Sequence, residues 1–186
     1  IFERVAQYDL PIWIHPKRGI DFSDYKSENH SQYWIFSMFG WPYETTAAMT
    51  RLVFSGILER FPNLKFITHH CGGMVPYFVE RIIGGQDYAE KCCNAKFKQG
   101  LSKEPIEYFR MFYADTALYG ASPSLMCGYA FFGADHVVFG TDMPYDSEGG
   151  DRYVRQTIEA VDSMNIPEAD REKIYAGNAK RLLGII

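Results

Sequence analysis

The feature that most constrains this fold is the alternation of short apolar runs with long helical patterns. Each run is compact and bounded by turn residues, as expected of a strand buried on both faces. Helical spacing of apolar residues separates the runs. The predicted strands cover residues 10–15, 64–70, 111–115 and 137–142, and the predicted helices cover 41–61, 75–93, 123–132, 152–164 and 167–183. Strands separated by long helices favour parallel pairing with right-handed crossovers, and therefore an α/β fold.

The composition supports one folded domain and argues against nucleic acid or a membrane as a partner. With 186 residues, 47% of them hydrophobic, and no repeat or linker, residues 1–186 are expected to form a single domain. A net charge of −4 without basic runs argues against nucleic acid as a partner. No apolar stretch approaches the roughly 20 residues of a membrane span. The four cysteines form no CxxC motif, which predicts reduced thiols in a cytoplasmic protein.

The connection over residues 17–40 is unusually long for a βα loop and rich in aromatic side chains. Long loops of this kind often form lids or binding segments. A packed excursion that covers the end of the sheet is the alternative. The loop aromatics would supply a flat apolar slot if the segment binds a ligand.

Polar side chains collect where the predicted strands end. His15, His70, Asp115 and Asp142 each close one strand. Taken singly, each has a structural explanation, such as a core histidine or an aspartate that caps a turn. Because active sites of parallel α/β folds lie at the carboxyl ends of the strands, their joint placement predicts a site. Two imidazoles and one carboxylate suit a divalent metal, with Asp115 orienting its neighbours.

The adjacent histidines His69 and His70 cannot both face the same side of the sheet if the strand remains regular. His70 shares a face with Thr68 and Phe66, whereas His69 shares one with Ile67. We favour His70 as the inward residue because it adjoins the Cys71-Gly72-Gly73 segment. Glycines there would let the backbone approach a ligand.

Four segments together resemble a known family. Residues 11–16, 68–73, 138–144 and 174–184 are similar to motifs of the amidohydrolase-related family. The resemblance is closer to its branch of aminocarboxymuconate-semialdehyde and γ-resorcylate decarboxylases. It implies a (β/α)8 TIM barrel with one divalent metal, of which this chain covers strands 5 to 8. Zinc is the first expectation for the metal, followed by manganese or magnesium.

The resemblance also implies roles for individual residues. His15 and Asp142 would be metal ligands, and His70 would be catalytic. Asp142 could also relay a proton to carbon. Arg81 matches an arginine that reaches a neighbouring subunit's site in some members, although a plain surface arginine is the alternative. Apart from the resemblance, Lys17, Arg18 or Arg81 would pair with a substrate carboxylate. Trp41 is a further candidate for substrate binding, and a homodimer or larger homo-oligomer is expected.

One departure from the family is large. The first-strand His-x-His or Glu-x-His ligand pair has no match here, and the chain opens at Ile1 in a helix already under way. We therefore expect the C-terminal half of a barrel. The leading hypothesis is a metal-dependent carboxy-lyase for a small carboxylated aromatic or muconate-like acid. A metal-dependent hydrolase of a lactone or amide, and a truncated non-catalytic fragment, are the alternatives.

Overall fold

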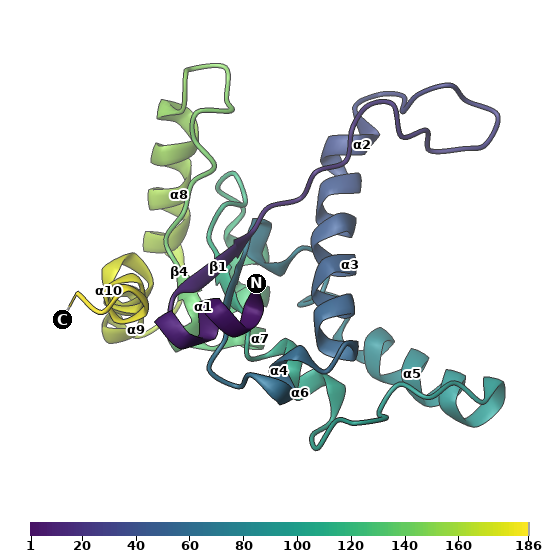
Figure 1. The fold of residues 1–186 in the computed structure, drawn as a ribbon. Helices are drawn as coiled ribbons and strands as arrows, with labels where there is room; N and C mark the ends of the chain where they lie inside the picture. Colours follow the sequence, from purple (N-terminus) through teal and green to yellow (C-terminus); the bar gives the residue numbers. More distant parts are fainter. Residues whose placement is uncertain (186) are drawn as a thin grey trace.

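Four parallel strands form one sheet in the order β1-β2-β3-β4 in the computed structural model, which describes residues 1–185 (Figure 1). Ile12 lies opposite Phe66 across the first pair, and Asp115 lies opposite Val138 across the last. The strands are β1 (Pro11–Ile14), β2 (Lys65–Thr68), β3 (Tyr113–Asp115) and β4 (Val137–Val138). All four predicted strands are present, but each is shorter than its apolar run. Strands β1, β2 and β4 end before His15, His70 and Asp142, whereas β3 includes Asp115, which is paired with Val138.

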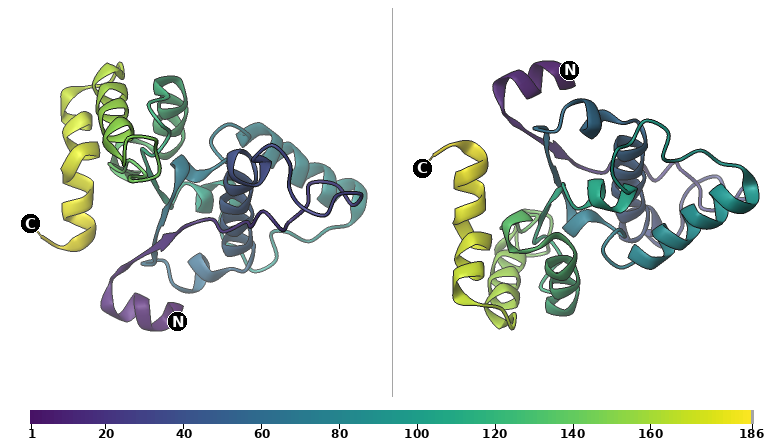
Figure 2. Two further views of the ribbon diagram at one scale, coloured as in Figure 1. Left: turned by 90° about the horizontal axis from the view of Figure 1, so that it is seen from above. Right: turned by 90° about the horizontal axis from the view of Figure 1, so that it is seen from below.

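Helices fill the connections between the strands. Figure 2 shows α1 beside the β1 edge of the sheet and α10 beside the β4 edge. No helix within residues 1–185 is both long and apolar enough to cross a bilayer. The helices are α1 (Phe2–Tyr8), α2 (Ile35–Met38), α3 (Gly40–Phe54), α4 (Ile57–Arg60), α5 (Val79–Cys93), α6 (Pro105–Phe109), α7 (Ser122–Phe132), α8 (Asp151–Ser163), α9 (Glu168–Glu172) and α10 (Asn178–Leu183), with short turns η1 (His70–Gly72), η2 (Ala134–His136) and η3 (Lys173–Gly177).

The helix predicted over residues 41–61 is divided in two. Helix α3 ends at Phe54, and α4 begins at Ile57. Gly56 between them has a φ of +70°, a left-handed conformation that glycine adopts at little cost. The apolar stripe is continuous across the break, so periodicity alone did not indicate it.

The two faces of the sheet have different surroundings. Successive side chains along a strand point to opposite faces of the sheet. Phe66, Ala114 and Val137 belong to the main hydrophobic core, which also contains buried residues of the surrounding helices. On the opposite, inner face, Ile67 and Val138 are buried with Leu182 of α10. The inner face leads along the strands directly to the polar residues at their carboxyl ends.

The long connection after β1 leaves the sheet and projects beyond α2 (Figure 1). Its own hydrogen bonds hold it together, because Asp24 Oδ2 accepts from the Ser31 hydroxyl at 2.7 Å and from the Gln32 N–H at 3.1 Å. The indole N–H of Trp41 donates to the Arg18 carbonyl at 3.0 Å. These bonds give the segment a defined path from the strand to α3.

Candidate metal centre

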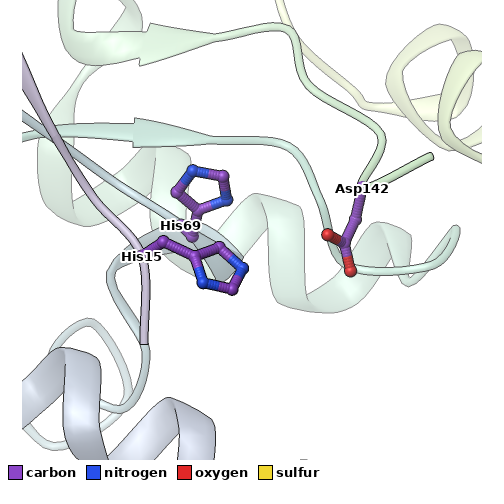
Figure 3. A group of neighbouring side chains, drawn as sticks. All are labelled: His15, His69 and Asp142. Atoms are coloured by element: carbon purple, nitrogen blue, oxygen red, sulfur yellow. The ribbon is translucent and has the colours of Figure 1, made fainter. Parts of the chain in front are cut away.

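Three side chains from different strand ends converge at one rim of the sheet. His15 follows β1, His69 follows β2 and Asp142 lies in the loop after β4, as Figure 3 shows. One ligand atom from each lies within 4.8 Å of the others. Ligand atoms in protein zinc sites lie about 2.0–2.2 Å from the ion, so small side-chain rotations would place all three around one cation. The structure thus brings together the predicted pair, His15 and Asp142, and adds His69.

The expectation that His69 and His70 point to opposite faces is wrong. Their rings lie 4.7 Å and 6.1 Å from the ring of His15. Strand β2 ends at Thr68, and the next residues leave the extended conformation. The φ angles are +53° at His70, +53° at Cys71, +76° at Gly72 and +63° at Gly73. This left-handed corner, residues 70–73, turns His70 toward the same rim that His69 already faces.

Close packing explains why the corner contains glycine. A Cβ on Gly73 would lie 2.4 Å from the carbonyl oxygen of Pro42, and a Cβ on Gly72 would lie 2.6 Å from Cζ of Phe132. Both glycines also have positive φ, which strains most L-residues. The sequence Gly72-Gly73 therefore permits both the reversal and the contact with α3.

Asp115 supports the rim from the end of β3. Its side chain is buried, and its Oδ1 accepts the backbone N–H groups of Cys71 at 3.2 Å and Ala117 at 3.1 Å. Its Oδ2 lies 3.4 Å from Nδ1 of His69. Burial raises the pKa of the Asp115 carboxyl. Asp115 thus joins the left-handed corner to β3. Its carboxylate also faces Nδ1 of His69, where it would orient the ring so that Nε2 points to the cation.

The protonation states of His69 and Asp142 suit a cation. Burial lowers the pKa of His69 to about 4, so its imidazole is neutral at pH 7. Burial opposes ionisation of Asp142, but the contacts from His70 and the Tyr119 hydroxyl hold the pKa of this carboxyl below its usual range. Metal ligation requires neutral imidazoles and ionised carboxylates. The donor set of His15, His69 and Asp142 therefore fits a divalent metal.

His70 lies beside this donor set. Its Nε2 is 3.5 Å from Oδ2 of Asp142. Both ring nitrogens are buried and form no hydrogen bond within residues 1–185, since this contact is at the limit of hydrogen-bond length. The Trp41 ring stacks at 6.4 Å from the His70 ring, with an interplanar angle of 28°. His70 is therefore placed to exchange a proton with Asp142 or with a ligand.

A cavity of about 550 Å³ adjoins His70 and Asp142. This volume lies in the range of small-molecule sites. Aromatic side chains form much of its wall: Trp34, Trp41, Tyr119, Tyr145 and Tyr153. A second hollow, of about 460 Å³, adjoins it at the rim and includes His15, His69 and Asp142. Within residues 1–185, no lysine or arginine lines either hollow.

The two predicted arginines lie outside these hollows. Arg18 forms an ion pair with Glu44 at 3.5 Å, and its guanidinium lies 4.5 Å from the centre of the Phe22 ring. Arg81 is exposed on α5. Neither side chain is brought to the rim by this chain alone, whereas Trp41 lines the larger cavity.

The fold and the rim define a class of protein, namely parallel α/β barrels whose polar site lies at the carboxyl ends of the strands. Within that class, the chain belongs to the amidohydrolase family, whose model matches residues 1–185. The family and the barrel fold predicted from sequence are thereby confirmed.

Known relatives are decarboxylases by name. The chain is 28% identical to a γ-resorcylate decarboxylase of Polaromonas sp., covering 97% of this chain and 52% of that protein. It is also 28% identical to a 2-amino-3-carboxymuconate-6-semialdehyde decarboxylase of Dictyostelium discoideum, covering 100% and 48% respectively. The chain thus spans about half the length of the curated relatives it matches.

A solved structure shows the same relationship. The dihydroxybenzoic acid decarboxylase of Polaromonas sp., crystallised with bound manganese and the inhibitor 2-nitroresorcinol, superposes with a TM-score of 0.78 at 27% identity. The match covers 99% of this chain and 52% of that one. The four β/α units described above therefore correspond to part of a larger barrel in that relative.

Proposed function

We propose that this protein is a metal-dependent carboxy-lyase that removes carbon dioxide from a small carboxylated aromatic acid. The observation that carries the proposal is the convergence of His15, His69 and Asp142 within 4.8 Å beside an aromatic-lined cavity. The decarboxylases among its relatives support the reaction type. A hydrolase on the same scaffold shares the donor set, but both curated relatives named above are decarboxylases.

His15, His69 and Asp142 would hold the divalent cation. When bound, the cation would supply positive charge to the substrate oxygens next to the bond that breaks. Zinc remains our expectation from the ligand types. The manganese in the Polaromonas relative makes manganese an equal candidate for this protein.

The reaction needs one proton at carbon. As the bond between the ring carbon and the carboxyl carbon breaks, its electron pair stays on the ring carbon, which takes up a proton, and carbon dioxide leaves. His70 would deliver this proton directly or through Asp142, whose Oδ2 is 3.5 Å from its Nε2. A general acid in this position contributes about 10²–10⁴-fold to the rate.

The cavity favours an aromatic acid over a muconate-like one. Its aromatic wall suits a flat ring. A muconate-like acid with a second carboxylate would need another cationic partner, and no lysine or arginine within residues 1–185 lines the cavity. Arg81 would contribute only from a neighbouring subunit, and Arg18 only after release from Glu44. We also propose a homo-oligomer that acts in the cytoplasm, where the four unpaired cysteines would remain reduced.

The test uses full-length protein freed of metal and reconstituted with Mn²⁺, Zn²⁺ or Mg²⁺. Each form is incubated with a panel of hydroxybenzoates and a carboxylated muconate semialdehyde, and carbon dioxide and product are measured. We expect equal amounts of both from a hydroxybenzoate. Consumption of lactone or amide substrates without carbon dioxide would support the hydrolase alternative. Metal binding without turnover of any substrate would support the non-catalytic alternative.

A further inference from the structure

We infer that Tyr119 is a positioning residue for Asp142. Its hydroxyl fixes the carboxylate so that one oxygen faces His70 and the other remains free for the cation. This inference rests on the proposed function, because it concerns the same donor set. It assigns a role to a residue that the sequence did not single out.

The contacts of the Asp142 carboxylate divide its two oxygens. The Tyr119 hydroxyl donates to Oδ2 at 3.0 Å, and Nε2 of His70 lies 3.5 Å from the same atom. No hydrogen bond within residues 1–185 reaches Oδ1. An aspartate side chain held by one of its oxygens cannot rotate freely about its terminal bond. The tyrosine therefore selects the orientation in which Oδ1 is available.

The backbone of the loop after β3 directs the tyrosine toward Asp142. Tyr119 has a φ of +53°, which is uncommon for an aromatic residue, and Gly120 follows with a φ of +85°. A Cβ on Gly120 would lie 2.9 Å from the Cβ of Gln156 in α8. The turn is thus packed closely against α8, and strain of this kind is retained where the surroundings determine the conformation.

The ring of Tyr119 is held from its other side. It stacks on Tyr153 with centroids 4.3 Å apart and an interplanar angle of 29°. The backbone N–H of Tyr153 donates to Asp146 at 2.8 Å, and the same side chain accepts the N–H of Gly150 at 3.1 Å. Asp146 therefore fixes the start of α8, which in turn supports Tyr119 and its hydroxyl.

The variant Tyr119→Phe tests the inference because it keeps the stacked ring and removes only the hydroxyl. Mn²⁺ affinity of metal-free full-length protein is measured by titration calorimetry, together with kcat and KM. Loss of a partner that orients a metal ligand costs about 10–100-fold in metal affinity or activity. We expect about tenfold weaker Mn²⁺ binding and a lower kcat at nearly unchanged KM.

The matched control is Tyr129→Phe, which removes another tyrosine–aspartate hydrogen bond. The Tyr129 hydroxyl donates to Asp170 at 2.7 Å, away from the rim. We expect wild-type Mn²⁺ affinity from this variant, and thermal unfolding checks that both variants are folded. An equal loss of affinity in both would overturn the inference, because the effect would then be general.

The remaining outcomes separate the inference from the proposed function. If wild type binds Mn²⁺ and Tyr119→Phe binds it equally well with the same kcat, the positioning role is wrong and the proposed function stands. If wild type binds none of Mn²⁺, Zn²⁺ and Mg²⁺, both are wrong. If Tyr119→Phe does not fold, Tyr153→Ala, which removes the stacking partner and leaves the hydroxyl, should also weaken Mn²⁺ binding; wild-type affinity there would contradict the inference.

Discussion

At the scale of single residues, two adjacent histidines have different surroundings. His69 faces His15 and Asp115, whereas His70 faces Trp41 and Asp142. We assign metal binding to His69 and proton transfer to His70. Because the assignments differ in kind, single substitutions at the two positions should have different effects.

Replacing His69 with alanine should weaken metal binding. The change removes a direct ligand. Loss of a residue that only orients a ligand lowers metal affinity about 10–100-fold, so Mn²⁺ affinity should fall by more than this in His69→Ala. Titration calorimetry on metal-free protein measures this. His136→Ala is the control, since this imidazole contacts the Arg110 carbonyl at 2.8 Å on another part of the sheet. Unchanged affinity in His69→Ala would contradict the assignment.

Replacing His70 with alanine should reduce turnover and leave Mn²⁺ affinity near that of wild type. Removal of a general acid lowers the rate by about 10²–10⁴-fold. Carbon dioxide release at saturating substrate measures the effect, and metal analysis of the same sample is the reference. A variant that releases carbon dioxide at the wild-type rate would show that His70 carries no proton in the reaction.

Sequence reasoning located most of the rim but expected only one of the two adjacent histidines to face it. His15 and Asp142 were found because they end apolar runs. Alternation allowed only one inward histidine, and His70 was chosen because it adjoins the Cys71-Gly72-Gly73 segment, although alternation places His69 with Ile67 on the inner face. What could not be read was the positive φ of His70, because a non-glycine residue in that conformation leaves no pattern in the sequence.

At the scale of elements, the left-handed corner of residues 70–73 should be sensitive to small changes. Gly73→Ala would place a methyl group against the Pro42 carbonyl at a positive φ, so we expect about 2 kcal/mol or more of lost stability. Denaturant unfolding measures it. Gly84→Ala in α5 is the control, because its Cβ would meet nothing within 4 Å and should stabilise the protein by about 0.5–1 kcal/mol. Equal effects would refute the packing argument.

The contact of Glu59 in α4 with Ser102 and with Tyr108 of α6 should make stability depend on pH. The Tyr108 hydroxyl and the Ser102 N–H and hydroxyl donate to Glu59, which lowers the pKa of this carboxyl. The stabilisation is present above the unfolded-state pKa near 4.5 and is lost as pH falls through the lower folded-state pKa. In Glu59→Gln, the difference in unfolding free energy from wild type should shrink below pH 4.5. A constant difference down to pH 3 would contradict this.

Element types were predicted better than their ends. The four apolar runs gave all four strands, and the helical stripes gave α3, α5, α7 and α8. The break at Gly56 and the short helix α6 depend on local backbone angles and tertiary contacts, which periodicity does not report. The order of strands and helices could therefore be predicted from the sequence, whereas the turns between them could be described only from the three-dimensional structure.

At the scale of the whole molecule, the sheet has one well-covered face and one that is partly open. Trp13 on the inner side of β1 is 57% exposed, and β1 and β4 are the two edge strands. Exposed edges and large apolar side chains promote association. The parallel α/β class was predicted from the strand–helix alternation and the barrel from the family resemblance, but the sequence did not show how far α10 covers the inner face.

A polypeptide limited to residues 1–186 should therefore self-associate. Size-exclusion chromatography with light scattering should show species larger than the monomer, increasing with concentration. Trp13→Gln should reduce this association, because it removes the largest exposed apolar side chain on the inner face. A concentration-independent monomer in both proteins would contradict the expectation.

The left-handed corner also constrains how this lineage can change. The corner brings the imidazoles of His69 and His70 to one rim. Inserting or deleting a single residue there would place one imidazole where the other belongs, or turn one of them away from the rim. The count of amino acids between β2 and α5 must consequently be inherited unaltered near the corner, while the excursion after β1 tolerates growth or trimming. Gaps in an alignment of descendants should accumulate in the second segment and spare the first.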